Sequence, residues 1–487
     1  MDPVKATGPL TATRTLSAMG PLTASGHPLQ RAGAWAAAVM AGRSHPDDVT
    51  TADAERVVQV MVQDVLSAAT AVKATDRYDW WKVLYALYPN SKATRNSRPR
   101  DRALLQAEIE ALFVADTAQA VGPCAFCSRP TSVLWAKSNL PLFDSSSVVN
   151  MLPLQMRGWP VCYGCRIAMW ALPYGAWVSA GSATVLSCES EEAIGQFARR
   201  NVQRARRIIQ AGFTGLSAGA SPEYVTLVAL RDAAPGLCAT TLWTFKNDNQ
   251  EPWLRVTQTR RAVPVFLARV DANAALRRGW HLLTRSLTRY DKAGKVTAHG
   301  VQEAARLLFE AEDGRSQSLL LRLHDLLKDD TGRSLPAGGR EGLARLALAY
   351  AQEVLGMTSD VTAVATLIAQ WIARGTSPRG RFAEYRSVAL SDYKLGMLLM
   401  QAYSRLLLDG QAPALAGPEQ WQALIQRRPR AWEQRMLLFA QVSVLLQQQG
   451  VAISDPPADG EEQRWLEALE NQPILDDAEF DYEMGPA

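Results

Sequence analysis

The sequence lacks most signatures of a catalytic or membrane-spanning chain. Its 487 residues include five histidines, and none has a spacing typical of a metal-ligand set or a catalytic triad. No Walker-type or dinucleotide-binding glycine loop occurs. No secretory signal is recognisable, and no run approaches the roughly 18 apolar residues of a membrane helix. The acidic pairs Asp329-Asp330 and Asp476-Asp477 are predicted to be solvated charge. The sequence therefore favours a non-enzymatic protein with no membrane partner.

Cysteine is also scarce. Only six cysteines occur, and four of them form two Cys-x-x-Cys pairs. The other two, Cys188 and Cys238, are predicted to be small buried hydrophobic residues. Such usage is typical of the reducing cytosol, so we expect a cytoplasmic protein.

The two cysteine pairs are the most specific feature of the chain. They read Cys124-Ala-Phe-Cys127 and Cys162-Tyr-Gly-Cys165, with 34 residues between them. Four thiolates in a tetrahedron suit Zn²⁺. The spacing predicts a closed structural zinc site that joins two distant loops, with Gly164 easing the second turn. Each pair is called a knuckle below. The alternatives to zinc are two disulfides, an iron–sulfur cluster, or knuckles that no longer bind metal.

Charge is distributed unevenly along the chain. The formal net charge is +4, but the residues from Asp455 onward carry −10, so the preceding residues carry +14. A basic body attracts polyanions such as nucleic acid. A generally arginine-rich surface explains the same charge without a partner.

The periodicity predicts an α+β fold in which a zinc-pinned N-terminal body with a short antiparallel sheet precedes an all-α helical bundle. Helices are expected at 29–40, at 50–73 with Thr50 as N-cap and Asp53 in a capping box, and at 191–210. Strands are expected at 177–181 and 183–188, and residues 222–270 are predicted to form further strands, at 224–230, 240–246 and 253–259.

From about residue 271 the apolar spacing is helical. The predicted helices are Val301–Glu312, Gln317–Lys328, Arg340–Leu355, Val361–Ala373, Tyr393–Leu408 and Trp421–Gln449. The predicted division is a flexible extension (1–21), the zinc-containing nucleic-acid-binding domain (22–270), the bundle (271–450) and a mobile acidic tail (451–487).

Three segments combine basic and amide side chains that suit phosphate and base contacts: a loop near residue 95, the helix from residue 191, and a predicted hairpin with its tip near residue 249. Solvated surface is the alternative interpretation for each segment. The candidate residues are Asn90, Lys92, Arg95, Asn96, Arg98, Arg100, Arg199, Arg200, Arg204, Lys246, Asn247, Asn249, Arg260 and Arg261.

The order of several short motifs resembles a known family. Ser25-Gly-His-Pro28 precedes Tyr88-Pro-Asn-Ser91, the first knuckle, Asn150-Met-Leu-Pro153 and the second knuckle. In this respect residues 22–180 resemble the CXXC–CXXC family of large subunits of type I-B CRISPR Cascade complexes. The matching positions are the four cysteines as metal ligands, together with Asn90 and Asn150.

The resemblance implies a non-catalytic antiviral-defence subunit that binds RNA and DNA. Such a subunit lies near the 5′ handle of the guide RNA, recognises the PAM on double-stranded target DNA and supports R-loop formation. The implied partners are the guide RNA, target DNA, other Cascade subunits, and a nuclease-helicase or, in a transposon-associated system, a transposition adaptor. The bundle resembles a Cascade small subunit, for which Met357 or Met397 is a candidate internal start. A zinc-ribbon nucleic-acid-processing enzyme of mobile-element origin and a purely structural assembly protein are the alternatives.

Overall fold

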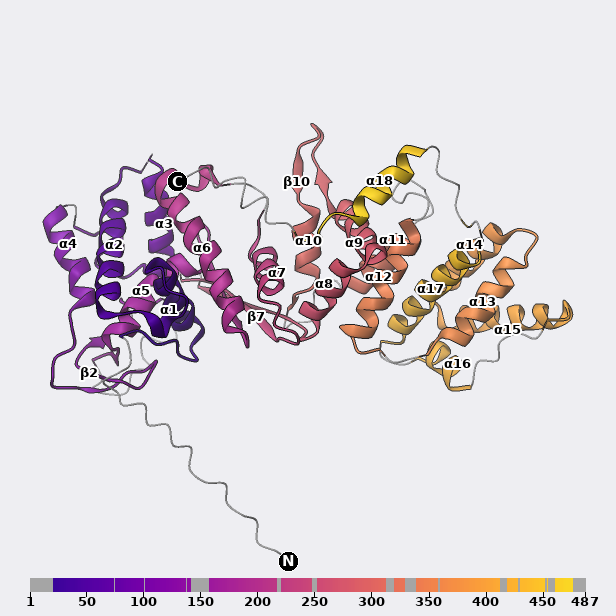
Figure 1. Ribbon diagram of the computed structural model, residues 1–487, viewed down its shortest axis with the longest axis horizontal. Coiled ribbons are helices and arrows are strands. Elements are labelled where there is room, and N and C mark those ends of the chain that lie inside the picture. The colour runs from indigo at the N-terminus through magenta and orange to yellow at the C-terminus, as the bar shows by residue number, and fades with distance from the viewer. Residues whose placement is uncertain are drawn as a thin grey trace, which may run out of the picture. The chain divides into compact units, whose positions relative to one another are not determined.

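The computed structural model (Figure 1) divides into two compact units. Unit 1 comprises Met1–Ser187, Ile194–Leu216 and Leu242–Arg255, and unit 2 comprises Cys188–Ala193, Ser217–Thr241 and Val256–Ala487. The residues described are 21–73, 75–99, 101–136, 138–141, 157–216, 220–247, 252–311, 319–328, 339–357, 360–411, 418–427, 430–451, 453 and 460–475. Residues 1–20 of the predicted extension (1–21), together with Arg100, Asn150 and Asn249, lie outside these residues.

The helices of the first part of the chain pack around a pair formed by α1 and α5. Gly33 of α1 approaches α5 so closely that an added Cβ would lie 1.7 Å from the carbonyl oxygen of Ala168. The helices are α1 (Pro28–Met40), η2 (Pro46–Asp48), α2 (Thr51–Thr70), α3 (Arg77–Leu87), α4 (Arg102–Glu110), η3 (Ala111–Phe113), α5 (Tyr163–Gly175), α6 (Glu191–Ala211) and η4 (Phe213–Gly215).

The predicted start of α2 is confirmed in detail. The Thr50 hydroxyl accepts a hydrogen bond from the Asp53 amide, and the Asp53 carboxylate accepts one from the Thr50 amide, which completes the capping box. Asp53 is 1% exposed and forms ion pairs with Arg43 and Arg56. The hydrogen bond from Arg43 and those from Thr50 lower the pKa of the Asp53 carboxyl. The local sequence therefore fixes this helix end as expected.

The strands are short. Two-stranded antiparallel pairs join β1 (Gly122–Pro123) with β2 (Pro130–Thr131) and β3 (Leu134–Trp135) with β4 (Trp159–Pro160). The largest sheet has the order β11-β8-β7-β6-β5. Its members are β5 (Trp177–Val178), β6 (Ala183–Cys188), β7 (Thr240–Lys246), β8 (Trp253–Thr259) and β11 (Glu310–Ala311). The expected strands at 183–188, 240–246 and 253–259 are confirmed.

The predicted strand at 224–230 is wrong, because these residues lie in helix α7 (Pro222–Ala233). Ser221 is the N-cap, with its hydroxyl accepting from the Tyr224 amide, and Pro222 occupies the first turn. Every residue from Tyr224 to Leu230 is buried. Because this helix is buried on all sides, its sequence shows no helical periodicity, and its β-branched residues wrongly suggested a strand.

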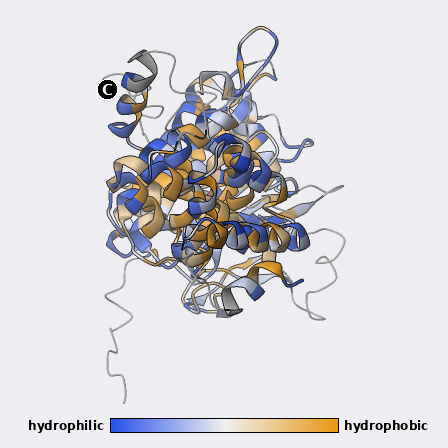
Figure 2. Cartoon of the chain, turned by 90° about the vertical axis from the view of Figure 1, so that its right-hand side faces the viewer, coloured by the Kyte–Doolittle hydropathy of each residue, from blue (hydrophilic) through white to orange (hydrophobic). Residues whose placement is uncertain are grey.

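The second part of the chain is mainly helical, with a two-stranded hairpin of β9 (Arg289–Tyr290) and β10 (Val296–Ala298). The helices are α8 (Val263–Ala272), α9 (Ala274–Leu287), α10 (Gly300–Leu307), α11 (Leu319–Lys328), α12 (Gly339–Glu353), α13 (Thr362–Ala373), α14 (Pro378–Val388), α15 (Asp392–Leu408), α16 (Pro418–Ile425), α17 (Ala431–Gln448) and α18 (Gly460–Glu470). Hydrophobic residues gather toward the middle of the packed helices in Figure 2.

Three details of this helical part differ from the prediction. The predicted helix Val301–Glu312 ends at Leu307, and Glu310–Ala311 form strand β11, which pairs with β8. The segment 421–449 is two helices, because Arg430 adopts a left-handed conformation (φ 63°) between α16 and α17. The acidic tail contains α18, which packs against α9 and buries Leu466 and Leu469. Among the described residues, no helix combines the length and apolar character needed to cross a membrane.

Candidate metal centre

The first cysteine pair lies on a tight turn between β1 and β2. The Cys124 amide donates to the Arg129 carbonyl at 2.7 Å, and the Ser128 amide donates to the Cys124 carbonyl at 2.9 Å. Ser128 has φ 63°, a left-handed conformation that glycine adopts at lower cost. The turn directs the thiols of Cys124 and Cys127 toward one point.

The second cysteine pair lies at the amino end of α5. Cys162 is the N-cap, and Cys165 lies in the first turn. The positive end of a helix dipole favours a thiolate at this position. Gly164 has a different role from the one predicted: an added Cβ would lie 1.8 Å from the Pro21 carbonyl oxygen, so this glycine permits close packing of two backbones.

The structure brings the four cysteines together, as the sequence predicts. The four Sγ atoms lie within 4.8 Å of one another, and those of Cys127 and Cys162 are 3.4 Å apart. A tetrahedral ion with Zn–S bonds of about 2.3 Å separates its sulfur ligands by roughly 3.8 Å. The donors therefore fit a closed four-thiolate metal site. They converge on one point instead of separating into two disulfide pairs, and all four are free thiols.

The thiols influence one another strongly. Hydrogen bonds from the Cys127, Cys162 and Cys165 thiols lower the pKa of Cys124. Hydrogen bonding to Cys124 and Cys127 raises the pKa of both Cys162 and Cys165, and burial adds to this effect. Like charges at this spacing repel, so the thiols resist losing all four protons together unless a cation is present. The cluster is suited to a cation for that reason.

Gln30 of α1 forms a hydrogen bond to a cysteine of the second knuckle. Its side chain is fully buried (0% exposed). Nε2 donates to Cys165 Sγ at 3.6 Å and to the Thr23 carbonyl at 2.7 Å, while Oε1 accepts from the Ser25 amide at 2.7 Å. Hydrogen bonds of this kind orient a ligand and tune its basicity.

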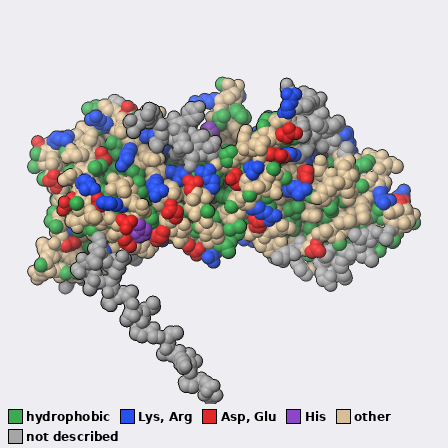
Figure 3. All heavy atoms as spheres, in the orientation of Figure 1, with side chains coloured by type: hydrophobic (Ala, Val, Ile, Leu, Met, Phe, Trp, Pro, Cys, Tyr) green, Lys and Arg blue, Asp and Glu red, His purple; other side chains and the backbone are tan. Residues whose placement is uncertain are grey.

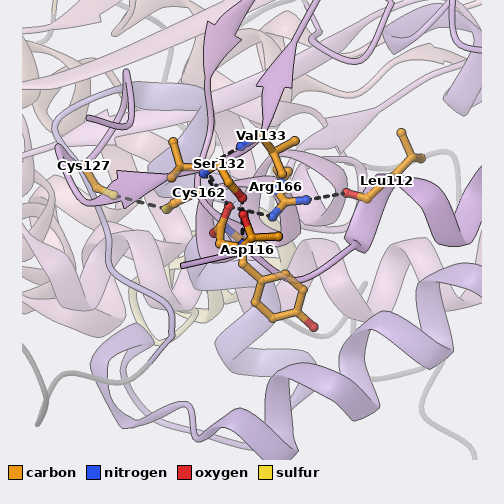
Figure 4. A network of polar contacts seen from close by, with 10 residues as sticks. Leu112, Asp116, Cys127, Ser132, Val133, Cys162 and Arg166 are labelled. Carbon is orange, nitrogen blue, oxygen red and sulfur yellow. Dashed lines mark hydrogen bonds and ion pairs between the residues drawn. The ribbon is translucent and has the colours of Figure 1, made fainter. Parts of the chain in front are cut away.

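A polar network centred on Asp116 joins the two knuckles (Figure 4). Its carboxylate accepts hydrogen bonds from the Thr131 hydroxyl at 2.7 Å and from the Tyr163 amide at 2.8 Å, and it pairs with Arg166 at 3.3 Å. Arg166 lies on α5 with no exposed surface, and burial lowers the pKa of its guanidinium. Sequence reasoning missed this pair, because neither residue belongs to a motif and their partnership arises from the fold.

Two of the motif pieces noted in the sequence also meet this module. The His27 ring packs edge-on against Phe126 of the first knuckle, with centroids 5.1 Å apart. The Tyr88 ring stacks on Trp170 of α5 at 4.4 Å, and its hydroxyl donates to the Met169 carbonyl. Residues from two distant parts of the chain thus contact the first knuckle and the helix that begins with the second.

The structure separates the predicted nucleic-acid residues into internal and surface groups. Arg98 is 4% exposed, stacks on Trp81 at 4.2 Å and donates to the Ala69 carbonyl at 2.8 Å. Asn247 is also buried and donates to the Leu87 carbonyl at 2.8 Å. These two side chains support the fold and do not reach a ligand at the surface.

The other loop residues lie nearer to solvent. Lys92 is exposed and pairs with Glu108 at 3.1 Å, and the Asn96 amide donates to the Tyr85 hydroxyl at 3.4 Å. Arg95 is exposed, whereas Asn90 and Lys246 are half-buried. Arg260 pairs with Glu310 at 2.9 Å and Arg261 with Glu189 at 3.2 Å. Figure 3 shows Lys and Arg dispersed among Asp and Glu on the visible face.

Helix α6 carries three of the candidates. Arg199 is exposed, while Arg200 is half-buried and donates to the Gln196 carbonyl at 3.3 Å. Arg204 stacks on Trp177 with its guanidinium 3.8 Å from the ring centre, and burial lowers its pKa to about 10. Of the three, Arg199 is the most accessible to a phosphate.

These features define the chain as an α+β protein, rich in helix, with a four-cysteine site that could hold a metal ion. Comparison with known proteins finds no matching family model, no matching characterised relative and no matching solved structure.

Proposed function

We propose that Cys124, Cys127, Cys162 and Cys165 bind one structural Zn²⁺. Four convergent thiols, three of them buried, form the usual closed donor set for this ion. The ion would supply folding free energy by joining the turn at 124–127 to the start of α5. Elemental analysis of freshly purified, reduced protein tests this proposal, with one zinc per chain expected.

We further propose that the chain is the non-catalytic large subunit of an RNA-guided type I-B surveillance complex in the cytoplasm. The observation that carries this proposal is the convergence of separated motif pieces. His27 contacts Phe126 of the first knuckle, Tyr88 stacks on the helix of the second, and the knuckles share one cluster. These are among the pieces on which the resemblance depends.

In this role, unit 1 would recognise the PAM on duplex DNA near the 5′ handle of the guide RNA and support opening of the duplex. Guide pairing would supply most of the sequence information. The accessible candidates Lys92, Arg95, Asn96 and Arg199 would contribute phosphate and base contacts. Recruitment of a nuclease-helicase or of a transposition adaptor would follow.

Reconstitution tests the proposal. The chain is co-expressed with the repeat-processing and backbone subunits of a type I-B complex and with a matching guide RNA. The proposal requires that the chain co-purify with the ribonucleoprotein and that a complex lacking it lose binding to a PAM-bearing duplex. Equal target binding without the chain contradicts the proposal. Unassisted, metal-dependent DNA cleavage by the purified chain would instead favour the zinc-ribbon enzyme.

One observation favours a second candidate, an assembly role for the helical bundle. Helix α15 exposes a row of large apolar residues on the face opposite its buried side: Tyr393 (75% exposed), Met397 (49%), Met400 (54%), Leu407 (51%) and Leu408 (81%). Exposed apolar rows of this kind mark protein-binding surfaces. Binding of DNA that is unchanged in an Arg95→Glu, Arg199→Glu double variant would point to assembly as the main role.

A further inference from the structure

Helix α6 exposes a line of polar side chains that the protein itself does not use. The helix has 21 residues and runs without a break (Figure 1). Four side chains at spacings of four, three and four residues are exposed along it: Arg199, Gln203, Arg206 and Gln210. We call this line the α6 ridge. At a rise of about 1.5 Å per residue the ridge is roughly 16 Å long.

Within the described part of the chain, none of these four side chains forms a hydrogen bond or an ion pair. Asp64 of α2 lies close enough to interact electrostatically with Arg206, but its hydrogen bond comes from the Tyr174 hydroxyl at 2.9 Å. The neighbouring Arg204, by contrast, stacks on Trp177. The donors of the ridge are therefore available to an external partner.

The charge of the helix favours a polyanion as that partner. No acidic residue occurs between Glu192 and Glu223, whereas five arginines do. Exposed helices are commonly stabilised by acids placed three or four residues from their cations. Arg199 and Arg206 have no such acid C-terminal to Glu192, so a partner with negative charge would complement them.

The glutamines of the ridge narrow the partner to nucleic acid. Arginine forms two hydrogen bonds with the major-groove edge of guanine, and glutamine forms two with that of adenine. An acidic protein surface would match the guanidinium groups alone. The major groove, about 12 Å wide, admits an α-helix, and the length of the ridge corresponds to roughly five base pairs at 3.4 Å each.

We propose that α6 lies in the major groove of duplex DNA and that the α6 ridge contacts base edges there. The inference rests on the proposed nucleic-acid-binding function and adds to it a definite reading element. Arg199 is one of the contacts expected from the sequence. Gln203, Arg206 and Gln210 are new positions, identified by their shared exposure with Arg199 on one side of the helix.

The first test uses the full-length, zinc-loaded chain and a pool of 24-base-pair duplexes with a random eight-base-pair core. Rounds of binding and amplification should enrich one core, which the wild type is expected to bind roughly 100-fold more tightly than an unselected duplex at equal salt. The Arg199→Gln, Arg206→Gln double variant should bring this ratio close to one. The matched control, Arg102→Gln with Arg374→Gln, removes two charges from exposed positions outside α6 and should keep the ratio.

The second test separates base contacts from charge. Gln203→Ala with Gln210→Ala should lower the ratio about 10-fold and leave the salt dependence of binding as in the wild type, because no cation is lost. Replacing the purines of the selected core with 7-deaza analogues removes the N7 acceptors of the major groove and changes no phosphate. Wild-type affinity should then fall by roughly 10-fold or more, and this measurement does not depend on the folding of any variant.

Three results overturn the proposal: equal binding of the 7-deaza core, an equal loss of the ratio in the control variant, and displacement of the duplex by poly-glutamate at equal charge concentration. The last result would favour an acidic protein as the partner.

The outcomes also separate this proposal from the proposed function. If the wild type binds duplex DNA but enriches no core, or if the arginine double variant keeps the ratio, nucleic-acid binding stands and the reading role of α6 fails. If the isolated chain binds no duplex, the same ratio is measured with the reconstituted complex on duplexes randomised beside the target. If that complex does not need the chain, the proposed function fails as well.

Discussion

The side-chain amide of Gln30 donates a hydrogen bond to Sγ of Cys165 across 3.6 Å, linking helix α1 to a thiol 135 residues later. The same amide bonds to the backbone of Thr23 and Ser25, so one buried residue serves both the loop before α1 and the second knuckle. With a metal ion bound to the four cysteines, this arrangement would make metal affinity depend on a residue that is not itself a ligand.

Gln30→Leu should therefore weaken zinc binding by about 10- to 100-fold. It should also lower the free energy of unfolding by roughly 1–3 kcal/mol, since two part-buried backbone groups lose their partners. Competition with a chromophoric chelator measures the first effect, and urea unfolding measures the second. Gln59→Leu, on the exposed side of α2, is the control and should change neither quantity. Unchanged affinity in Gln30→Leu would remove this residue from the site.

Cys162→Ser should reduce bound zinc by removing one of four ligands, with affinity falling at least roughly 100-fold. Hydrogen exchange should rise in α1 and α5 but stay unchanged in α12 and α17, because the proposed ion would stabilise unit 1. The control, Cys238→Ser, alters a buried cysteine outside the cluster and should keep one zinc per chain. Full zinc retention in Cys162→Ser would contradict the assignment of this ligand.

Gly33→Ala should destabilise unit 1 by about 1–3 kcal/mol, since its Cβ would lie 1.7 Å from the Ala168 carbonyl oxygen and force α1 away from α5. Gly26→Ala is the matched control in the same segment. Nothing lies within 4 Å of its added Cβ, so its unfolding midpoint should stay close to the wild type. Thermal unfolding of both variants, with zinc content measured in parallel, tests whether only Gly33→Ala lowers stability.

Ser128→Gly should stabilise the first knuckle by about 1 kcal/mol, because serine at φ 63° bears a steric cost that glycine avoids. Zinc stoichiometry should stay the same. The control is Ser97→Gly at an exposed loop position. It measures the effect of added chain flexibility alone and should not stabilise the protein. A Ser128→Gly variant less stable than Ser97→Gly would show that the serine side chain has a role of its own.

His324 predicts a pH dependence of the helical bundle. It is 1% exposed on α11, packs edge-on against Phe439 at 5.1 Å, and burial lowers its pKa to about 4. An unfolded histidine titrates near 6.5, so the unfolded state binds the proton first as the pH falls. Stability should be constant above about pH 6.5 and decline by roughly 3 kcal/mol toward pH 4.

Hydrogen exchange in α11 and α17 at several pH values measures this decline separately from zinc release in unit 1. His324→Leu should flatten the dependence between pH 6.5 and 4, whereas His299→Leu should leave it as in the wild type. An unchanged slope in His324→Leu would assign the effect to other groups.

Features that depend only on local sequence could be predicted. The cysteine pairs and the Thr50–Asp53 capping box depend on spacing alone, and both occur as expected. Helix α7 was not predictable in this way, because burial on all sides leaves no periodic pattern. The internal positions of Arg98 and Asn247 depend on Trp81 and on the Leu87 carbonyl, and these partners become known only in the fold.

The Asp116–Arg166 pair shows the same limit. Fifty residues separate the two in sequence, and they meet only because the fold brings α5 to the loop after η3. Composition can suggest that arginines bind a polyanion, but only coordinates show which arginines are already engaged by the protein.

The packing of α18 against α9 limits which shorter gene products could fold by themselves. A polypeptide begun at Met357 would include α13 to α18 but neither α9, against which α18 packs, nor α12, against which α17 packs. Two apolar helix faces would then meet water, and Glu470 would lose its ion pair with Arg278. Such a product would need a foreign surface in place of the missing helices, so its solubility when made alone would report whether it exists as an independent molecule.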